Sequence, residues 1–244
     1  MTTIVSAFIS NVNKRCDRDI KKYYELGKYL LLSSTPKIIF VDETMFQMIQ
    51  NTDYNKENTN IIKIKKENVY LYDYLHLITK FELDTDNENK DSLEYMFAMC
   101  NKTEFMRQAI ELNSFKSDQF IWVDFGIKHI FKCSDNEFIE KINCLHFIKK
   151  YDKIRIASIW NLDNLYNINL YKNIAWYFAG GIFGGDINSL NQFANLMKEK
   201  CIEIITTKNT IMWEVNIWYL IYNENKELFD SYYGNHDNTI IDNY

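Results

Sequence analysis

The sequence predicts an α/β fold in which a mostly parallel central sheet is flanked by helices. Apolar runs of strand length alternate along the chain with segments of helical periodicity, which is typical of this class. The first three elements follow in β-α-β order, and such a unit forms a right-handed crossover between parallel strands. No linker-like stretch or internal repeat divides the 244 residues, so we expect a single domain over residues 1–244.

The first β-α-β unit is delimited by a cap and a proline. Residues 3–9 are predicted to form a strand, and Asp17 is expected to cap the helix that follows. The inner face of this helix is expected to include Ile20, Tyr23, Tyr24, Leu30 and Leu31. The Thr35-Pro36 pair ends the helix, because the residue before a proline avoids helical backbone angles. Residues 37–41 then form a second buried strand.

The later elements continue this alternation. Strands are predicted at 61–64, 119–123 and 153–158, and helices at 70–79, 93–113 and 138–147. The helix at 93–113 can break near Asn101. A further helix carries on one face Leu190, Phe193, Ala194, Met197 and Cys201, and residues 211–222 form a nearly continuous apolar helix. The polar segments 51–60 and 84–91 are expected to be surface loops.

The composition disfavours several classes of protein. A net charge of −5 without a long basic run argues against a nucleic-acid binder. No segment reaches the length of apolar sequence that a membrane span needs, so none is expected. The first residues lack the charged region of a signal peptide, and we therefore expect a cytoplasmic protein.

The cysteines are odd in number and widely spaced, at Cys16, Cys100, Cys133, Cys144 and Cys201. No pair has the C-x-x-C spacing, so free thiols are expected rather than a disulfide framework or a zinc site. A metal ion shared by Cys133, Cys144 and His146 is the less favoured alternative.

Four of the seven glycines lie in Gly180-Gly181-Ile182-Phe183-Gly184-Gly185. Glycine is required where the backbone turns tightly or where a ligand approaches it closely. We predict a strand–turn–strand whose backbone faces a polyhydroxy ligand, with a purely structural turn as the alternative. Two further glycines stand near Asp124 and His236, and the three glycine segments are predicted to be walls of one site.

Asp124 follows a short buried strand directly. In open α/β sheets ligands bind outside the carboxyl ends of the strands, and a carboxylate there suits a hard divalent cation that also holds phosphate. The alternative is a turn aspartate that caps the next segment. The triplet Asp124-Phe125-Gly126 matches the kinase D-F-G motif, but no kinase catalytic loop accompanies it.

Glu214 is one of two strongly polar residues in the apolar segment 211–222. A carboxylate inside such a helix must be paired, protonated or functional, because burying an isolated charge is costly. It is therefore either a catalytic group or a glutamate held by a structural partner. His236 lies in a polar, glycine-containing turn and is a candidate metal ligand.

Two longer patterns resemble known families. Residues 113–126, which end in Trp122-Val123-Asp124-Phe125-Gly126, resemble the bacterial HtrL/YibB family of glycosyltransferase-like proteins, as do residues 179–185 and the opening residues 3–8. Residues 177–219 are similar to the blood-group A and B transferases, which have a Gly-Gly-aromatic-aromatic-Gly-Gly run and then a helix with Trp-x-x-Glu. Here Trp213 directly precedes Glu214.

Both resemblances imply a GT-A fold, a nucleotide-sugar-binding domain that holds a metal ion with an Asp-x-Asp motif. Residues 124–126 take the place of that motif and supply one carboxylate, that of Asp124. In some GT-A families a C-terminal histidine completes the coordination. The resemblance therefore implies Mn²⁺ or Mg²⁺ bound by Asp124 and His236.

The implied function is glycan biosynthesis by a hexosyl- or pentosyltransferase. It would move a sugar from a nucleotide-sugar donor to a hydroxyl of a glycan or another acceptor, with Glu214 as the catalytic carboxylate. The sugar subsite would be formed by Gly180, Gly181, Gly184 and Gly185. The nucleotide would be bound by Ser6, Ala7, Phe8, Arg15, Asp124 and Gly126, with Asn11 and Arg18 nearby. The alternatives are a metal-dependent nucleotidyltransferase or phosphohydrolase, and a non-catalytic binding or structural protein of the same fold.

Overall fold

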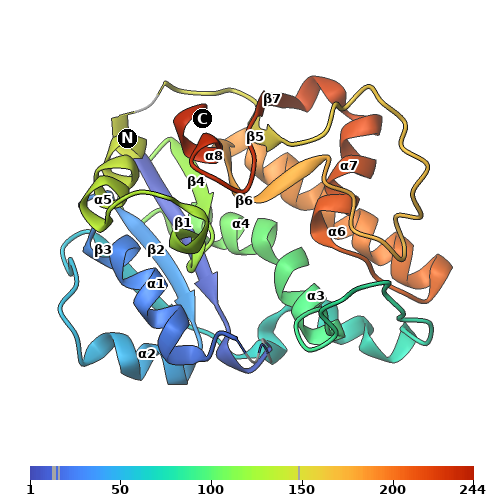
Figure 1. The fold of residues 1–244 in the computed structure, drawn as a ribbon, viewed down its shortest axis with the longest axis horizontal. Coiled ribbons are helices and arrows are strands. Elements are labelled where there is room, and N and C mark those ends of the chain that lie inside the picture. The colour runs from blue at the N-terminus through green and yellow to red at the C-terminus, as the bar shows by residue number, and fades with distance from the viewer. Residues whose placement is uncertain (13–14, 16, 148) are drawn as a thin grey trace.

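A seven-stranded sheet forms the centre of the computed structural model, which describes residues 1–12, 15, 17–147 and 149–244 (Figure 1). The strands are β1 (Thr2–Phe8), β2 (Lys37–Val41), β3 (Thr59–Lys63), β4 (Gln119–Val123), β5 (Ile154–Ser158), β6 (Phe178–Asp186) and β7 (Phe229–Tyr233). Their order is β3-β2-β1-β4-β6-β5-β7. Strand β6 runs antiparallel to both neighbours, and the other described strands share one direction. The prediction of a mostly parallel sheet is confirmed.

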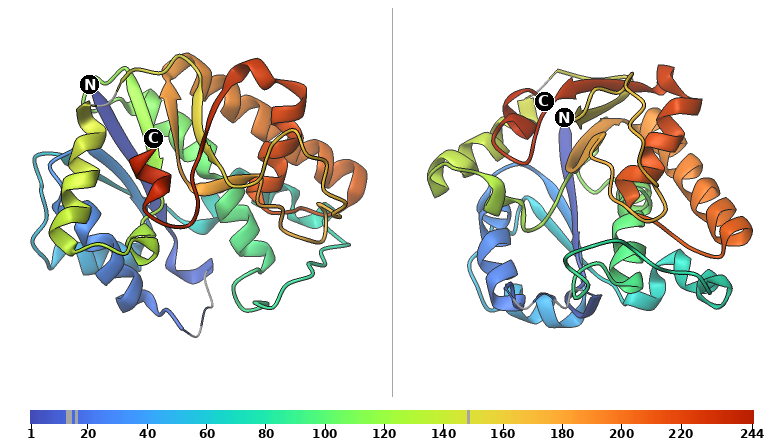
Figure 2. Two further views of the ribbon diagram at one scale, coloured as in Figure 1. Left: turned by 45° about the horizontal axis from the view of Figure 1, so that its top comes forward. Right: turned by 45° about the vertical axis from the view of Figure 1, so that its right-hand side comes forward.

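Helices cover both faces of this sheet (Figure 2). One face carries α1 (Ile20–Leu32), α2 (Glu43–Gln50), α5 (Asp135–Cys144) and α8 (Thr239–Asp242). The other carries α3 (Leu93–Cys100), α4 (Lys102–Leu112), α6 (Ile187–Lys208) and α7 (Glu214–Glu224). Two apolar cores result, one on each side of the sheet, and the inner strands are buried between them, whereas the edge strands β3 and β7 are partly exposed.

Several predicted elements are confirmed. The strands at 37–41 and 119–123 have the predicted bounds, and both are buried at every position. The long helical segment breaks at Asn101 into α3 and α4, as expected. The predicted face of α6 is buried, because it packs into the core beside α4. Residues 70–77 form a 3₁₀ helix rather than an α-helix, and α2, β7 and α8 were not predicted.

The glycine-rich segment is one continuous strand, so the prediction of a strand–turn–strand is wrong. Strand β6 lies between β4 and β5 in the sheet, and none of its glycines has a positive φ angle. A turn would leave the middle of the sheet unpaired. These glycines therefore reflect close packing rather than backbone reversal.

Two helix starts also differ from the sequence prediction. Asp19 rather than Asp17 caps α1, because its carboxylate accepts a hydrogen bond from the Lys22 N–H at 2.8 Å. Asp17 instead accepts from Arg15. Helix α7 begins at Glu214, and the three residues before it are buried but not helical.

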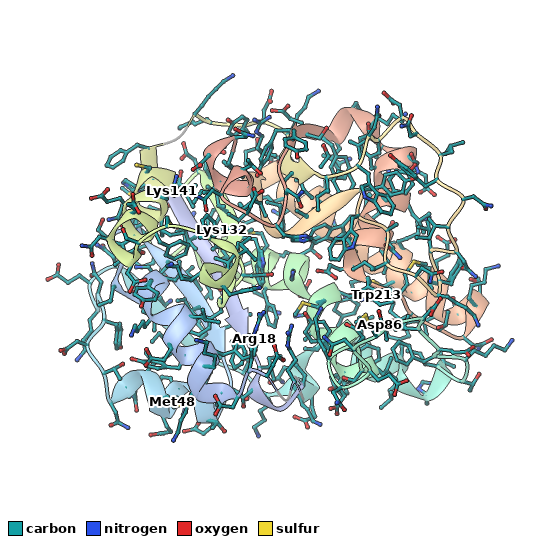
Figure 3. The ribbon with its side chains drawn as sticks, viewed as in Figure 1. Arg18, Met48, Asp86, Lys132, Lys141 and Trp213 are labelled. Atoms are coloured by element: carbon teal, nitrogen blue, oxygen red, sulfur yellow. The ribbon has the colours of Figure 1, made fainter. Side chains whose placement is uncertain are left out.

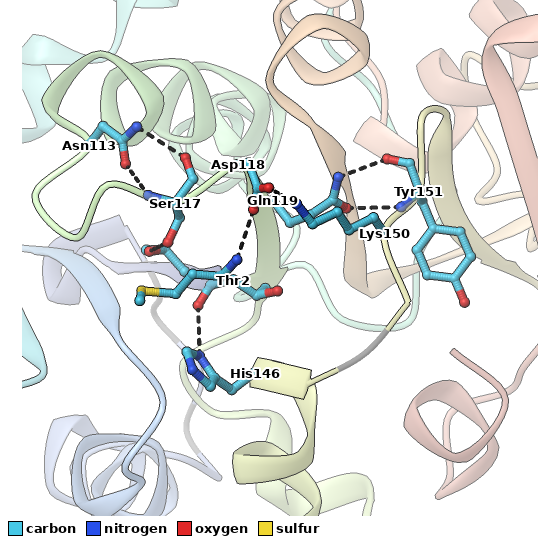
Figure 4. A network of polar contacts seen from close by, with 10 residues as sticks. Thr2, Asn113, Ser117, Asp118, Gln119, His146, Lys150 and Tyr151 are labelled. Atoms are coloured by element: carbon cyan, nitrogen blue, oxygen red, sulfur yellow. Dashed lines mark hydrogen bonds and ion pairs between the residues drawn. The ribbon is translucent and has the colours of Figure 1, made fainter.

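A polar network fixes the amino ends of β1 and β4 (Figure 4). The Asn113 side chain accepts from the N–H of Ser117 and donates to its carbonyl, and Asp118 pairs with both the N-terminal ammonium and Lys150. His146 lies 3.4 Å from the Thr2 carbonyl. These contacts hold the amino ends of β1 and β4 in place. A ligand site is expected at the opposite, carboxyl ends of the strands.

The cysteines that the structure describes, Cys100, Cys133, Cys144 and Cys201, are free thiols, as expected, and Cys16 lies outside the described residues. Cys133, Cys144 and His146 do not form a metal-ligand cluster within residues 17–147. Across the described part of the chain, no helix has the length and apolar character needed to cross a bilayer.

Candidate functional site

A cavity of about 230 Å³ opens at the carboxyl ends of β1 and β4. These strands are neighbours, but the chain leaves β1 toward β2 on one side and later returns to β4 on the other, which opens a crevice at this edge. The lining includes Ala7, Phe8, Asp124, Gly180 and Gly181. The cavity therefore lies where the strand-end position of Asp124 predicted a ligand.

Asp124 is held by backbone and side-chain contacts at the mouth of β4. Its N–H donates to the Gly181 carbonyl at 2.9 Å, and its Oδ1 accepts from Trp122 Nε1 at 2.7 Å. The same oxygen lies 3.0 Å from Lys102 Nζ. The side chain is 38% exposed, so the carboxylate is fixed in direction yet accessible from the cavity.

Lys102, the first residue of α4, is the centre of the polar cluster. Its side chain is 2% exposed, and Nζ donates to Glu214 Oε1 at 3.0 Å, to the Gly180 carbonyl at 2.9 Å and to Asp124. Three acceptors match the three N–H bonds of an ammonium. Burial alone would lower the pKa of Lys102, but Asp124 and Glu214 outweigh burial and raise it, so the side chain stays charged.

Glu214 is buried, as predicted, with its side chain 8% exposed. Its position differs from the prediction, because it is the first residue of α7 rather than part of a helix interior. A helix N-terminus stabilises a carboxylate, and Lys102 is the partner that such burial requires. Glu214 lines the cavity together with Asp124.

Gly180 allows this cluster to approach the sheet. A Cβ atom at Gly180 would lie 2.7 Å from Glu214 Oε1 and 3.2 Å from Val215 Cγ1. A Cβ atom at Gly181 would meet the flexible end of Ile127, at 3.0 Å. Both glycines line the cavity.

Gly184 and Gly185 lie farther along β6 and are not among the described residues that line the cavity. A Cβ atom at Gly184 would lie 2.6 Å from the Phe120 carbonyl, and one at Gly185 would lie 2.7 Å from the Lys153 carbonyl. These two glycines serve packing within the sheet, and their place in a sugar subsite stays a prediction that the described lining does not support.

The predicted nucleotide-binding residues fall into two groups. Ala7, Phe8, Arg15 and Gly126 line the cavity, whereas Ser6 is fully buried and lies outside the lining. The side chain of Asn11 lies outside the described part of the structure.

Basic side chains line the same cavity. Arg15 pairs with Asp17, and Arg18 Nε lies 3.6 Å from Asp17 Oδ2. Lys90 also contributes to the lining. Figure 3 labels Arg18 and Trp213, which line the cavity from distant parts of the chain.

His129 also lines the cavity, although no feature of the sequence around it indicates a site. Its Nδ1 lies 2.7 Å from the Gly126 carbonyl. Burial lowers the pKa of His129, even though the hydrogen bond to Gly126 raises it, and Arg18 adds to the lowering. The ring is therefore mostly neutral at neutral pH.

His236 reaches the cavity from the turn after β7. Its ring packs edge-to-face on Trp176, with 4.5 Å between the ring centroids. Trp176 itself is positioned by the buried Asn216, whose amide accepts from the Ala175 N–H and donates to the carbonyls of two residues in the preceding loop. Burial lowers the pKa of His236, and the nearby His129 adds to this lowering.

The side chains at the cavity differ from those expected to bind Mn²⁺ or Mg²⁺. Within the described ranges, no three His, Cys, Asp or Glu side chains are placed so that they could hold a metal ion together. The carboxylate of Asp124 is already engaged by the Lys102 ammonium and the Trp122 indole. The residues therefore do not fit a divalent-metal centre as the sequence implied it, and metal binding by Asp124 and His236 stays a prediction.

Lys102 is the main site residue that the sequence analysis missed. It contacts side chains 22 and 112 positions away, and no local pattern reports such contacts. The available signal was the helix break at Asn101, which places Lys102 at the start of a helix, where an unpaired cation is unfavourable.

Comparison with known proteins extends the description. A family model described as "Bacterial protein of unknown function (HtrL_YibB)" matches residues 1–239. Protein HtrL of Escherichia coli (strain K12) is 24% identical over 258 residues, which cover 95% of this chain and 87% of HtrL.

Two solved structures align with most of the chain. Mouse xyloside xylosyltransferase 1 in its apo form aligns with a TM-score of 0.49 at 11% identity, over 95% of this chain and 85% of that one. The 4-diphosphocytidyl-2C-methyl-D-erythritol synthase from Anaerococcus prevotii DSM 20548 aligns with a TM-score of 0.42 at 10% identity, over 96% and 86%.

Proposed function

The chain belongs to the HtrL/YibB family of bacterial proteins, and we propose that it is a glycosyltransferase that uses a nucleotide-sugar donor. The observation that supports this most is the cluster of Lys102, Asp124 and Glu214 beside Gly180 in one cavity. It combines an accessible carboxylate, a buried carboxylate and a strand backbone without side chains at a ligand-binding edge of the sheet.

The donor's charge and the basic lining are complementary. A nucleotide sugar carries a diphosphate, and Arg15, Arg18 and Lys90 all line the cavity. Arginine binds phosphate oxygens through two parallel hydrogen bonds, which adds direction as well as charge. We therefore assign the diphosphate to this basic part of the lining, between the ends of β1 and β4.

The sugar is assigned to the space beside Gly180 and Gly181. Both glycines line the cavity, and Gly180 lets Glu214 lie close to the strand, so a hexose or pentose ring in this part of the cavity would contact the Glu214 carboxylate. Glu214 then faces the reacting carbon. It stabilises positive charge on the sugar or acts as nucleophile if the configuration is retained, and it takes the acceptor's proton if the configuration is inverted.

The two alternative functions have less support from the described residues. A nucleotidyltransferase or phosphohydrolase needs further acids near Asp124, and no third ligand-type side chain joins the cluster within the described ranges. A non-catalytic protein would be indicated by a plugged cavity, whereas the Asp124 carboxylate is accessible.

A thermal-shift panel of nucleotide sugars tests the proposal. A ligand present at a hundredfold excess over its Kd stabilises by about 2.7 kcal/mol, which for a chain of this size raises the Tm by roughly 5–10 °C. We expect one combination of base and sugar to exceed its own nucleoside diphosphate and the free sugar. If every nucleotide sugar leaves the Tm unchanged, the proposed function is wrong.

A further inference from the structure

The Lys102 ammonium occupies the point on which the oxygen ligands of the cluster converge. Glu214 Oε1 and Asp124 Oδ1 each lie 3.0 Å from Nζ, and the Gly180 carbonyl oxygen lies 2.9 Å away. Two carboxylates and a carbonyl are ligands that a hard divalent cation prefers. Here they surround an amino group that belongs to the protein.

We propose that Lys102 takes the place of a divalent cation in this site, so that the two carboxylates are held without Mn²⁺ or Mg²⁺. The charges support this. One positive and two negative groups leave a single net negative charge in the cluster, whereas a carboxylate pair without a cation would carry two. A divalent ion bound by Asp124 would also lie next to the ammonium, and the two cations would repel each other.

The geometry leaves Lys102 no hydrogen for a substrate, because each N–H bond already has an acceptor. Lys102 is therefore a positioning residue, which aims Asp124 and Glu214 into the cavity. As far as it concerns sugar transfer, this inference rests on the proposed function. Its consequence is that the departing diphosphate is stabilised by cationic side chains of the lining, such as Arg18.

Binding of Mn²⁺ alone tests the inference, because it requires no donor. We expect the unaltered protein to take up no Mn²⁺ that depends on Asp124, as measured by the loss of the free-ion signal in electron paramagnetic resonance. Lys102→Ala removes the ammonium and leaves three oxygen ligands around the vacated space. This variant should gain one Mn²⁺ site, and Lys102→Ala combined with Asp124→Asn should lose it again.

Two results would overturn the inference. One is a Mn²⁺ site in the unaltered protein that Asp124→Asn removes. The other is a folded Lys102→Ala variant, with unchanged circular dichroism, that gains no Mn²⁺. If Lys102→Ala does not fold, the unaltered protein and its Asp124→Asn variant still decide the question. Failure of the proposed function would appear separately, as an absence of Tm shifts with nucleotide sugars.

Discussion

Lys102 Nζ lies 3.0 Å from Glu214 Oε1, although the two residues are 112 positions apart in the chain. Each is the first residue of its helix, Lys102 of α4 and Glu214 of α7. The positive end of a helix dipole favours the glutamate and disfavours the lysine, so the ion pair is what makes the buried lysine tolerable. The contact joins two helices of one face of the sheet at the cavity.

Arg18→Ala should weaken binding of the nucleoside diphosphate by about tenfold or more, since a hydrogen bond to a charged group is worth roughly 1.5–3 kcal/mol. The side chain lines the cavity, and its only described ion pair, with Asp17, is long, at 3.6 Å. Calorimetric titration with the nucleoside diphosphate and with the nucleoside alone would measure the effect.

The matched control for Arg18 is Arg107→Ala, because Arg107 pairs with Glu104 on α4 and is not among the described lining residues. It should leave both affinities unchanged. An equal loss for the nucleoside and its diphosphate in Arg18→Ala would mean that Arg18 does not bind phosphate.

Gly180→Ala should disturb the site more than the fold. The new Cβ would lie 2.7 Å from Glu214 Oε1, so the carboxylate has to move, while the rest of the strand keeps its pairing. We expect a clear loss of nucleotide-sugar affinity, with the affinity for the nucleoside diphosphate nearly unchanged. Equal affinities of the variant and the unaltered protein for the sugar donor would remove Gly180 from the sugar subsite.

Gly184→Ala should disturb the fold more than the site. Its Cβ would lie 2.6 Å from the Phe120 carbonyl, which belongs to the paired strand and cannot rotate away. Overpacking of this kind costs about 1–3 kcal/mol of the free energy of unfolding. Urea denaturation should show this loss, and donor affinity of the folded variant should be unchanged. An undiminished urea midpoint would contradict the packing role.

Lys37→Met should stabilise the protein at and below neutral pH. Lys37 on β2 is fully buried, and burial lowers its pKa to about 7. Below pH 7 the lysine is charged in both the folded and unfolded states, and the folded state bears the desolvation cost. Between pH 7 and about 10.4 only the unfolded state keeps the proton, so this group's contribution to stability rises with pH.

The advantage of Lys37→Met in urea denaturation should therefore shrink as the pH rises from 7 to 10. Lowering the pKa of Lys37 from 10.5 to about 7 corresponds to roughly 4–5 kcal/mol of the free energy of unfolding. The advantage of Lys37→Met is smaller than this, because the substitution also removes the hydrogen bond that Lys37 Nζ donates to the Ser33 carbonyl. A difference between variant and unaltered protein that does not change with pH would show that Lys37 is charged in the fold.

The sheet could be predicted because its signals are local. The strands at 37–41 and 119–123 are short apolar runs between polar residues, and the order of strands and helices determines that most strands are parallel. Asp124 was found by the same reasoning, since the end of a buried strand is a position along the sequence.

The roles of the β6 glycines and of Lys102 could not be predicted from the sequence, because they depend on contacts between distant residues. A glycine run is compatible with a turn or with close packing, and only the neighbours of β6, such as Tyr244 and Glu214, distinguish the two. The role of Lys102 likewise depends on the contact between the first residues of α4 and α7, which are distant in the sequence and meet only in the folded chain.

The most direct test of the proposed chemistry is donor turnover by Glu214→Gln. Glutamine keeps the size of the side chain and can still accept the hydrogen bond from Lys102, but it lacks the negative charge. With the donor identified by thermal shift, release of the nucleoside diphosphate should fall about 10²–10⁴-fold, while the donor Kd stays nearly unchanged. Glu104→Gln is the matched control, because Glu104 is also a buried, ion-paired glutamate but is not among the described lining residues, and its turnover should be near normal. Near-normal turnover in Glu214→Gln would contradict the account and remove Glu214 from the reaction.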